Sequence, residues 1–371
     1  MLMKEGARKE MAIRRALPLP QRVLAVEGAL PGYRYSQAEI LVECRKAFAP
    51  LLDKPGRADL FSRVGVESRC LVEPMEYYFS GKNFESRNRD FLRHALALSK
   101  RCVRGVLRSS GVKFSDVGHI FSVTTTGLAT PSIEAHLVQS LPFFRRVKRT
   151  PIFGVGCAGG AVALARAREY LSAYPKETAL VLSVELCSLS FLPQEKTMTQ
   201  IIAAALFGDG AAAVLLCGAR SPFAARAALE LADSESALFP ASLDVMGWEF
   251  GEEGMRLVLS PRAPILVERN LGELVLPFLK RHGMTPRDLA TLVIHPGSLK
   301  ILDACEVSLG LPPGSCDPSR KFLRKNANLS SASVFFILRE ALKQKEPRGT
   351  QGLLAALGPG FACEMTLLRW L

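Results

Sequence analysis

Cys157 stands in a stretch whose residue types suit nucleophilic catalysis. Residues 154–160 read Gly-Val-Gly-Cys-Ala-Gly-Gly, between an expected strand at 151–156 and an expected helix at 161–172. A thiol at a helix N-terminus meets the positive end of the helix dipole, which favours the thiolate. The glycines leave room for a substrate carbonyl and leave N–H groups free to face an oxyanion. Cys157 is therefore either an acyl-accepting nucleophile or a small buried hydrophobe at a tight turn.

Two further polar residues follow expected elements in the second part of the chain. His295 comes directly after an apolar strand at 291–294, and a Pro-Gly pair follows it. Open α/β sheets place their ligands at the carboxyl ends of strands, so the imidazole is a candidate for function as well as for a structural role. Asn328 precedes an expected helix at 332–343. Its amide either caps a turn or polarises a carbonyl.

Length and cysteine content exclude several classes of protein. With 371 residues, of which 48% are hydrophobic, the chain can form one large core or two fused domains. Its nine cysteines lack paired Cys-x-x-Cys spacing, which argues for reduced thiols and against a zinc site. The basic start at residues 1–22 has no apolar stretch of the signal-peptide kind after it. We expect a cytoplasmic protein without membrane insertion.

The formal charge of +13 raises the question of a nucleic-acid partner. The Lys and Arg residues are scattered along the chain and have no interleaved aromatic residues, so we expect no nucleic-acid binding. A small phosphorylated ligand such as coenzyme A uses the same kind of charge.

The chain reads as two similar halves. A helix at 88–109 precedes an apolar strand and a small polar turn within 112–127, and a helix at 265–281 precedes the same sequence of elements within 285–297. Further strands are expected at 179–185, 211–218, 352–357 and 362–370. Continuous apolar strands alternating with helices predict an α/β fold with sheets covered on both faces. We place the boundary between halves 1–220 and 221–371.

Five motifs in order carry a resemblance to a known family. They are Cys157 after its strand, Phe207 in Leu-Phe-Gly-Asp-Gly-Ala, His295 in His-Pro-Gly, Asn328 in Asn-Leu-Ser-Ser-Ala, and the Gly358-Pro359-Gly360 turn. Across roughly residues 20–371 the chain resembles the type III polyketide synthases, the chalcone synthase-like branch of the thiolase superfamily. In character it is similar to bacterial alkylpyrone and alkylresorcinol synthases. The resemblance implies a thiolase-like five-layered αβαβα fold built from two duplicated halves, and a homodimer.

The resemblance also implies the chemistry. Cys157 accepts the acyl group of an acyl-CoA, and malonyl-CoA is decarboxylated to the carbanion that extends it. His295 pairs with Cys157 as an imidazolium and lowers its pKa. His295 and Asn328 then hold the malonyl carbonyl and stabilise the enolate. Acyl-CoA and malonyl-CoA are the expected partners, and no metal or organic cofactor is expected.

The family's cavity positions differ here from those of the plant enzymes. Phe207 corresponds to one gatekeeper, Leu257 stands where the second is usually Phe, and Trp248 stands where plant members carry Gly. The starter-pocket positions carry small side chains, namely Thr125, Thr126, Thr130, Cys187 and Ser190. Small walls leave room for a tunnel that buries an alkyl tail at about 0.8 kcal/mol per methylene. We therefore expect a medium- or long-chain acyl-CoA starter and an alkylpyrone or alkylresorcinol product.

Two smaller expectations concern the edges of this cavity. The Gly358-Pro359-Gly360 turn either closes a hairpin or forms a cavity wall. Arg63, and less strongly Arg57, is expected to bind the coenzyme A phosphates, with ordinary surface charge as the alternative.

Other functions remain open from the sequence. A β-ketoacyl-ACP synthase III-like enzyme uses the same Cys, His and Asn, and a hydroxymethylglutaryl-CoA synthase needs a glutamate near the cysteine, for which we find no candidate. From another class, a non-catalytic basic binding protein can have the same fold. Starter length, the number of extensions, the ring formed, delivery by an acyl carrier protein and the pathway are not determined.

Overall fold

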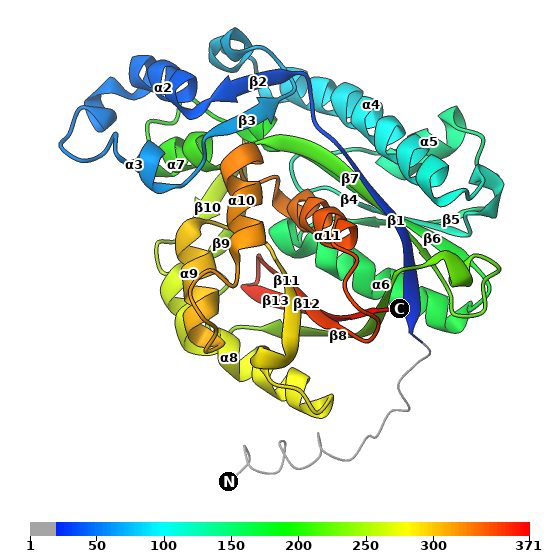
Figure 1. The fold of residues 1–371 in the computed structure, drawn as a ribbon. Helices are drawn as coiled ribbons and strands as arrows, with labels where there is room; N and C mark the ends of the chain where they lie inside the picture. The colour runs from blue at the N-terminus through cyan, green and yellow to red at the C-terminus, as the bar shows by residue number, and fades with distance from the viewer. Residues whose placement is uncertain (1–19) are drawn as a thin grey trace.

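The structure, a computed structural model, describes residues 20–371 (Figure 1). The segment on which the expectation about a signal peptide rests lies almost entirely outside these residues. Within the described range no helix is both long and apolar enough to span a membrane.

One mixed sheet runs through the molecule in the order β11-β12-β13-β8-β1-β7-β6-β4-β5. Its strands are β1 (Gln21–Ala29), β4 (His119–Val123), β5 (Lys148–Ile152), β6 (Thr178–Leu186), β7 (Asp209–Cys217), β8 (Leu229–Leu238), β11 (Leu289–Ile294), β12 (Gln351–Gly358) and β13 (Ala362–Trp370). Two short antiparallel pairs lie outside it. They are β2 (Tyr33–Ser36) with β3 (Ser68–Leu71), and the hairpin of β9 (Met246–Gly251) with β10 (Gly254–Leu259).

The helices alternate with these strands. They are α2 (Gln37–Leu52), α3 (Leu60–Arg63), α4 (Phe84–Ser110), α5 (Ile133–Ser140), α6 (Gly159–Ala173), α7 (Met198–Leu206), α8 (Ala263–Arg281), α9 (Leu299–Ser308), α10 (Asp317–Asn326) and α11 (Ser333–Lys343). The 3₁₀ turns are η2 (Met75–Phe79), η3 (Phe114–Asp116), η4 (Gly156–Ala158), η5 (Cys187–Ser190), η6 (Ala224–Arg226), η7 (Pro286–Asp288) and η8 (Ser330–Ala332).

The pairing pattern of the sheet occurs twice. In the first half β4 is parallel to β6, while β6–β7 and β7–β1 are antiparallel. In the second half β11 is parallel to β12, while β12–β13 and β13–β8 are antiparallel. The two sets join only through the short antiparallel contact of β1 with β8. Among the described residues β5 has no counterpart in the second half. The division at residue 220 remains a prediction.

Helices form three layers around the two parts of the sheet. On one outer face α4 packs on β1, β6 and β7. In the middle, α6 contacts strands of both halves and α11 contacts β1, β7 and β11. On the other outer face α8 packs on α9 and β13 (Figure 1). Three separate hydrophobic clusters correspond to these three helical layers. The observed fold is therefore α/β with five αβαβα layers, as expected.

Strand β6 shows why continuous apolar runs predicted these strands. All nine of its residues are buried. Leu180 and Leu182 point into the outer cluster with α4, whereas Ala179 and Val181 point into the central cluster. Because both faces of the strand are covered, both sets of alternating positions are mostly apolar, and the buried polar side chains of Ser183 and Glu185 are hydrogen-bonded.

The strand expected at 151–156 is wrong at both ends. The strand β5 runs from Lys148 to Ile152. Gly154 and Gly156 have φ angles of +85° and +48°, in the left-handed region that glycine favours, so the chain leaves the sheet before Cys157. Cys157 therefore lies in the turn η4 rather than at the end of a strand.

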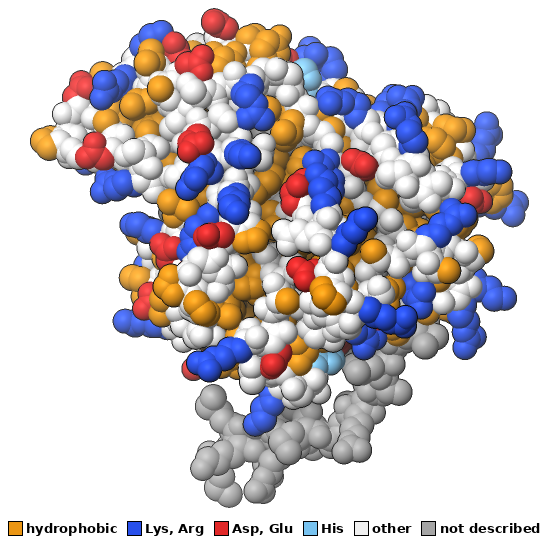
Figure 2. All heavy atoms as spheres, viewed as in Figure 1, with side chains coloured by type: hydrophobic (Ala, Val, Ile, Leu, Met, Phe, Trp, Pro, Cys, Tyr) orange, Lys and Arg blue, Asp and Glu red, His pale blue; other side chains and the backbone are white. Residues whose placement is uncertain are grey.

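Lys and Arg side chains are spread over the face seen in Figure 2 and are interspersed with Asp and Glu. This distribution agrees with the scattered positive charge in the sequence.

The middle layer depends on a close approach at Gly160, in the first turn of α6. A Cβ atom at this position would lie 2.4 Å from the backbone oxygen of Ser331. Gly105, in α4, differs because a Cβ there would meet only ordinary contacts, the nearest at 3.5 Å from Glu27 Cβ.

We predict opposite effects for alanine at these two helical glycines. Gly105→Ala should stabilise the protein by about 0.5–1 kcal/mol through reduced backbone entropy of the unfolded chain. Gly160→Ala should destabilise it and reduce activity, because α6 must move away from Ser331. Denaturant unfolding and turnover measured on both variants check this. Equal stability changes in the two variants would contradict it.

Candidate active site

Cys157 lies in η4 and is only 7% exposed, at the wall of a mostly apolar cavity. Burial, together with the nearby charge of Glu185, raises the pKa of its thiol to about 12. Hydrogen bonds with the side chains of Ser330 and Asn328 oppose this shift. Two polar side chains from the second half of the chain therefore lie near the sulfur and favour its ionised form.

His295 follows β11, where its backbone N–H donates to Ala355 O of the neighbouring strand at 2.8 Å. The side chain is buried, and neither Nδ1 nor Nε2 has a hydrogen-bond partner among the described residues. Burial lowers the pKa of this imidazole to about 3. Two unpartnered ring nitrogens in a buried position are costly for folding and are typical of a site that a ligand completes.

Asn328 connects the cysteine with the histidine turn. Its Nδ2 donates to Gly297 O at 3.3 Å, in the turn after His295, and its Oδ1 accepts from the N–H of Ser330 at 2.8 Å. Its backbone forms an isolated bridge with Phe207. Asn328 therefore connects Cys157 with the backbone turn that follows His295.

The electrostatics of this group differ from the expected ion pair. The environment raises the pKa of Cys157 and lowers that of His295, so burial favours the neutral thiol and the neutral imidazole. The expected imidazolium is thus not the form that this environment favours.

Glu185 is a residue near the site that the sequence analysis missed. It is fully buried in β6, where its carboxyl accepts from the Thr125 N–H at 3.0 Å, from Thr126 Oγ1 at 2.9 Å and from Ser331 Oγ. Burial raises its pKa to about 7. The signal was present, because Glu185 is the one ionisable residue in the apolar strand at 178–186.

The cavity beside Cys157 encloses about 1010 Å³, counting the space that opens to solvent. The predicted residues that line it are Thr125, Thr126, Cys157, Cys187, Ser190, Phe207, Trp248, Leu257 and Pro359. Most of the remaining wall is apolar, from α2, η2 and α7.

Several predicted residues lie outside this lining. His295 and Asn328 are buried without lining it, and Thr130 is exposed at the surface of the chain. Arg63 is exposed and its Nη2 donates to Gly56 O at 3.0 Å, while Arg57 contacts Met198 Sδ at 3.6 Å. Neither arginine reaches the cavity.

The turn at 358–360 has both of the roles that the sequence left open. It closes the hairpin between β12 and β13, with Gly358 paired to Ala362. Pro359 lines the cavity, and a Cβ atom at Gly156 would lie 2.4 Å from Pro359 Cδ. Gly358 and Gly360 themselves do not line the cavity.

The hairpin of β9 and β10 forms another wall. Trp248 and Leu257 are direct cross-strand partners in it, so the two positions that differ from the plant enzymes are neighbours. The hairpin tip is held by Arg87, whose Nη2 donates to Glu253 O at 2.6 Å and whose Nη1 donates to Phe191 O at 3.1 Å.

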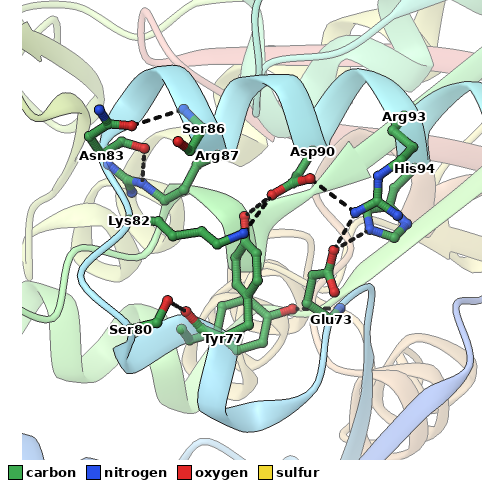
Figure 3. Close-up of polar contacts among 11 residues, drawn as sticks. Glu73, Tyr77, Ser80, Lys82, Asn83, Ser86, Arg87, Asp90, Arg93 and His94 are labelled. Atoms are coloured by element: carbon green, nitrogen blue, oxygen red, sulfur yellow. Dashed lines mark hydrogen bonds and ion pairs between the residues drawn. The ribbon is translucent and has the colours of Figure 1, made fainter.

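One wall of the cavity is formed by η2, and a polar network holds η2 against the start of α4 (Figure 3). Tyr77 donates to Asp90 Oδ2 at 2.7 Å, and Glu73 Oε1 contacts His94 Nε2 at 2.7 Å and Arg93 Nη2 at 2.6 Å. Met75, Tyr78 and Phe79 of the same turn line the cavity.

A buried thiol beside a carboxamide from the other half of the chain, and a buried imidazole at the turn which that carboxamide bonds, are the residue types of thiolase-type condensing enzymes. The chain matches the chalcone and stilbene synthase N-terminal domain over residues 9–220 and the C-terminal domain over residues 230–371. It therefore belongs to the chalcone and stilbene synthase family, and it is a type III polyketide synthase, an acyltransferase of the condensing kind.

Individual relatives agree with this assignment. A putative chalcone synthase of Bacillus subtilis (strain 168) is 38% identical over 358 residues, which are 94% of this chain and 98% of that protein. A 1,3,6,8-tetrahydroxynaphthalene synthase of Streptomyces peucetius subsp. caesius is 38% identical over 355 residues, 94% of this chain and 93% of that one. The crystal structure of the 1,3,6,8-tetrahydroxynaphthalene synthase of Streptomyces coelicolor A3(2) superposes with a TM-score of 0.86 at 28% identity, covering 94% of this chain and 99% of that one.

We predict that Glu185→Gln makes Cys157 reactive at lower pH. The charged carboxylate raises the pKa of the thiol, so its removal should lower that pKa. The measurement is the rate of iodoacetamide alkylation at Cys157 against pH, followed by mass spectrometry. Glu134→Gln is the matched control, because Glu134 is also fully buried but accepts from Ser122 and Ser132 instead. Superimposable profiles for Glu185→Gln and the wild type would contradict the prediction.

Proposed function

We propose that the protein loads a medium- or long-chain acyl-CoA on Cys157, extends it with malonyl-CoA and releases an alkylpyrone or alkylresorcinol. The observation that supports this most strongly is the mostly apolar cavity with the buried thiol in its wall. In this proposal the protein works as a homodimer and needs no metal or organic cofactor.

The proposed steps assign a role to each residue of the site. The thiol of Cys157 loses its proton to His295, attacks the acyl-CoA carbonyl and forms a thioester as the coenzyme A thiolate leaves. The His295 ring and the Asn328 amide then hold the malonyl carbonyl oxygen, on which negative charge appears as carbon dioxide leaves. The free ring nitrogens of His295 support this role, since they have no other buried partner among residues 20–371.

The shape of the cavity supports an alkyl starter. Beyond Cys187 the wall is formed by Ile40 and Cys44 of α2, and by Leu71, Met75 and Phe79. No charged side chain other than Arg69 lines this cavity among the described residues, and the Arg69 guanidinium is occupied by protein carbonyls. An aliphatic chain is the ligand that gains most from such a wall, through burial of its methylenes.

The experiment that tests the proposed function is mass spectrometry of products from a panel of acyl-CoA starters with malonyl-CoA. We expect products that contain the starter and two or three malonyl-derived units, and none with Cys157→Ala. A product from malonyl-CoA alone, with no added starter incorporated, would overturn the acyl starter. Failure of every starter to give a malonyl-derived product would overturn the whole proposal.

Two arms of the same experiment address the alternatives. Extension with malonyl-ACP but not with malonyl-CoA would favour a β-ketoacyl-ACP synthase III-like enzyme. Absence of any Cys157 labelling by iodoacetamide, together with salt-sensitive DNA binding, would favour a non-catalytic basic protein. The ratio of pyrone to resorcinol is read from the same spectra, with Trp248→Gly as a test of the hairpin wall.

We predict that Cys44→Phe shortens the preferred starter. Cys44 lines the cavity from α2, and the larger ring should exclude the end of a long chain. Each methylene that no longer fits should reduce kcat/KM about fourfold, since its burial is worth about 0.8 kcal/mol. Val42→Phe is the control, because Val42 lies on the exposed face of the same helix. An unchanged chain-length profile in Cys44→Phe would contradict the assignment of this wall.

A further inference from the structure

The C-terminal end of α7 is held by groups from both halves of the chain. Of the last four carbonyls of this helix, only Ala203 O accepts a hydrogen bond of the helical pattern, from the Phe207 N–H at 3.0 Å. Ala204 O and Ala205 O accept from the guanidinium of Arg69. Leu206 O accepts from the backbone N–H of Asn328 at 2.9 Å. Every one of these carbonyls is therefore satisfied.

Arg69 is a fully buried residue of β3. Its Nη1 donates to Ala204 O and, at 2.8 Å, to Phe207 O, and its Nη2 donates to Ala205 O at 2.7 Å and to Gln37 Oε1. These four bonds use all four Nη hydrogens, so the Nη groups have none left for a substrate phosphate. The charge lies at the negative end of the α7 dipole, where a cation is favourable.

The same segment positions the catalytic amide. Phe207 and Asn328 form an isolated parallel bridge, in which the Gly208 N–H donates to Asn328 O at 3.0 Å. A Cβ atom at Gly208 would lie 3.2 Å from Arg69 Cβ, so the segment packs directly on the arginine. A shift of residues 206–208 must therefore move both the gatekeeper ring and the backbone of Asn328.

We propose that Arg69 is a positioning residue for malonyl-CoA decarboxylation, because its guanidinium fixes the Phe207 segment and, through it, the Asn328 amide. The inference rests on the proposed role of Asn328. Acyl transfer to Cys157 depends less on Arg69, since Cys157 is carried by η4 and α6, which Arg69 does not touch.

The test separates the two half-reactions in Arg69→Gln and Arg69→Lys. Malonyl-CoA decarboxylation without starter is measured by release of carbon dioxide, and acyl loading on Cys157 is measured by intact-protein mass spectrometry. We expect kcat of decarboxylation to fall about tenfold to a hundredfold in Arg69→Gln, as for a small misplacement of a catalytic group, with loading unchanged. Arg69→Lys keeps the charge and should recover part of the rate.

Arg168→Gln is the matched control. Arg168 is also buried and also donates to carbonyls, those of Leu231 and Ala232, but it lies away from the cavity. The Arg168→Gln substitution should lower the thermal stability of the protein without changing the ratio of the decarboxylation rate to the loading rate. Wild-type decarboxylation in Arg69→Gln, or an equal fall of both half-reactions in either Arg69 variant, would overturn the inference. A wild-type enzyme that does not decarboxylate malonyl-CoA would instead overturn the proposed function, and the inference with it.

Discussion

The contact between the first turn of α6 and the backbone around Ser331 is the constraint on which the site depends. Gly159 and Gly160 have no Cβ atoms to keep the two segments apart, and Ser331 is also hydrogen-bonded to Ser183 and Glu185 of β6. This contact joins the two halves and brings the sulfur from one half against the amide from the other. Neither half alone contains the arrangement that the chemistry requires.

A reactive thiol in this position has a cost that the surroundings only partly offset. Burial favours its neutral form, and so does the neighbouring carboxyl group of Glu185, while the hydroxyl of Ser330 and the amide of Asn328 act in the opposite direction. Burial likewise favours the neutral form of His295 and makes its imidazole a weaker base than a free one.

Much of the fold could be predicted from the sequence, because strands covered on both faces have no polar alternation and read as apolar runs. The order of catalytic motifs also located the site. The part that could not be predicted was how deeply individual side chains are buried. Thr130 lies at the surface, Arg69 is fully buried although arginines are usually exposed, and Glu185 looked like an ordinary residue near the end of a strand. These differences come from packing between segments far apart in the chain, which no local pattern records.

The position of β13 has a consequence for synthesis of the protein. This last strand, ending at Trp370, lies between β12 and β8 in the interior of the second half of the sheet. A growing chain can complete the first half once β7 has been made, but β12 and β8 have no strand between them until β13 has been synthesised. The facing edges of β12 and β8 are therefore open to pairing with other chains while the second half is being translated.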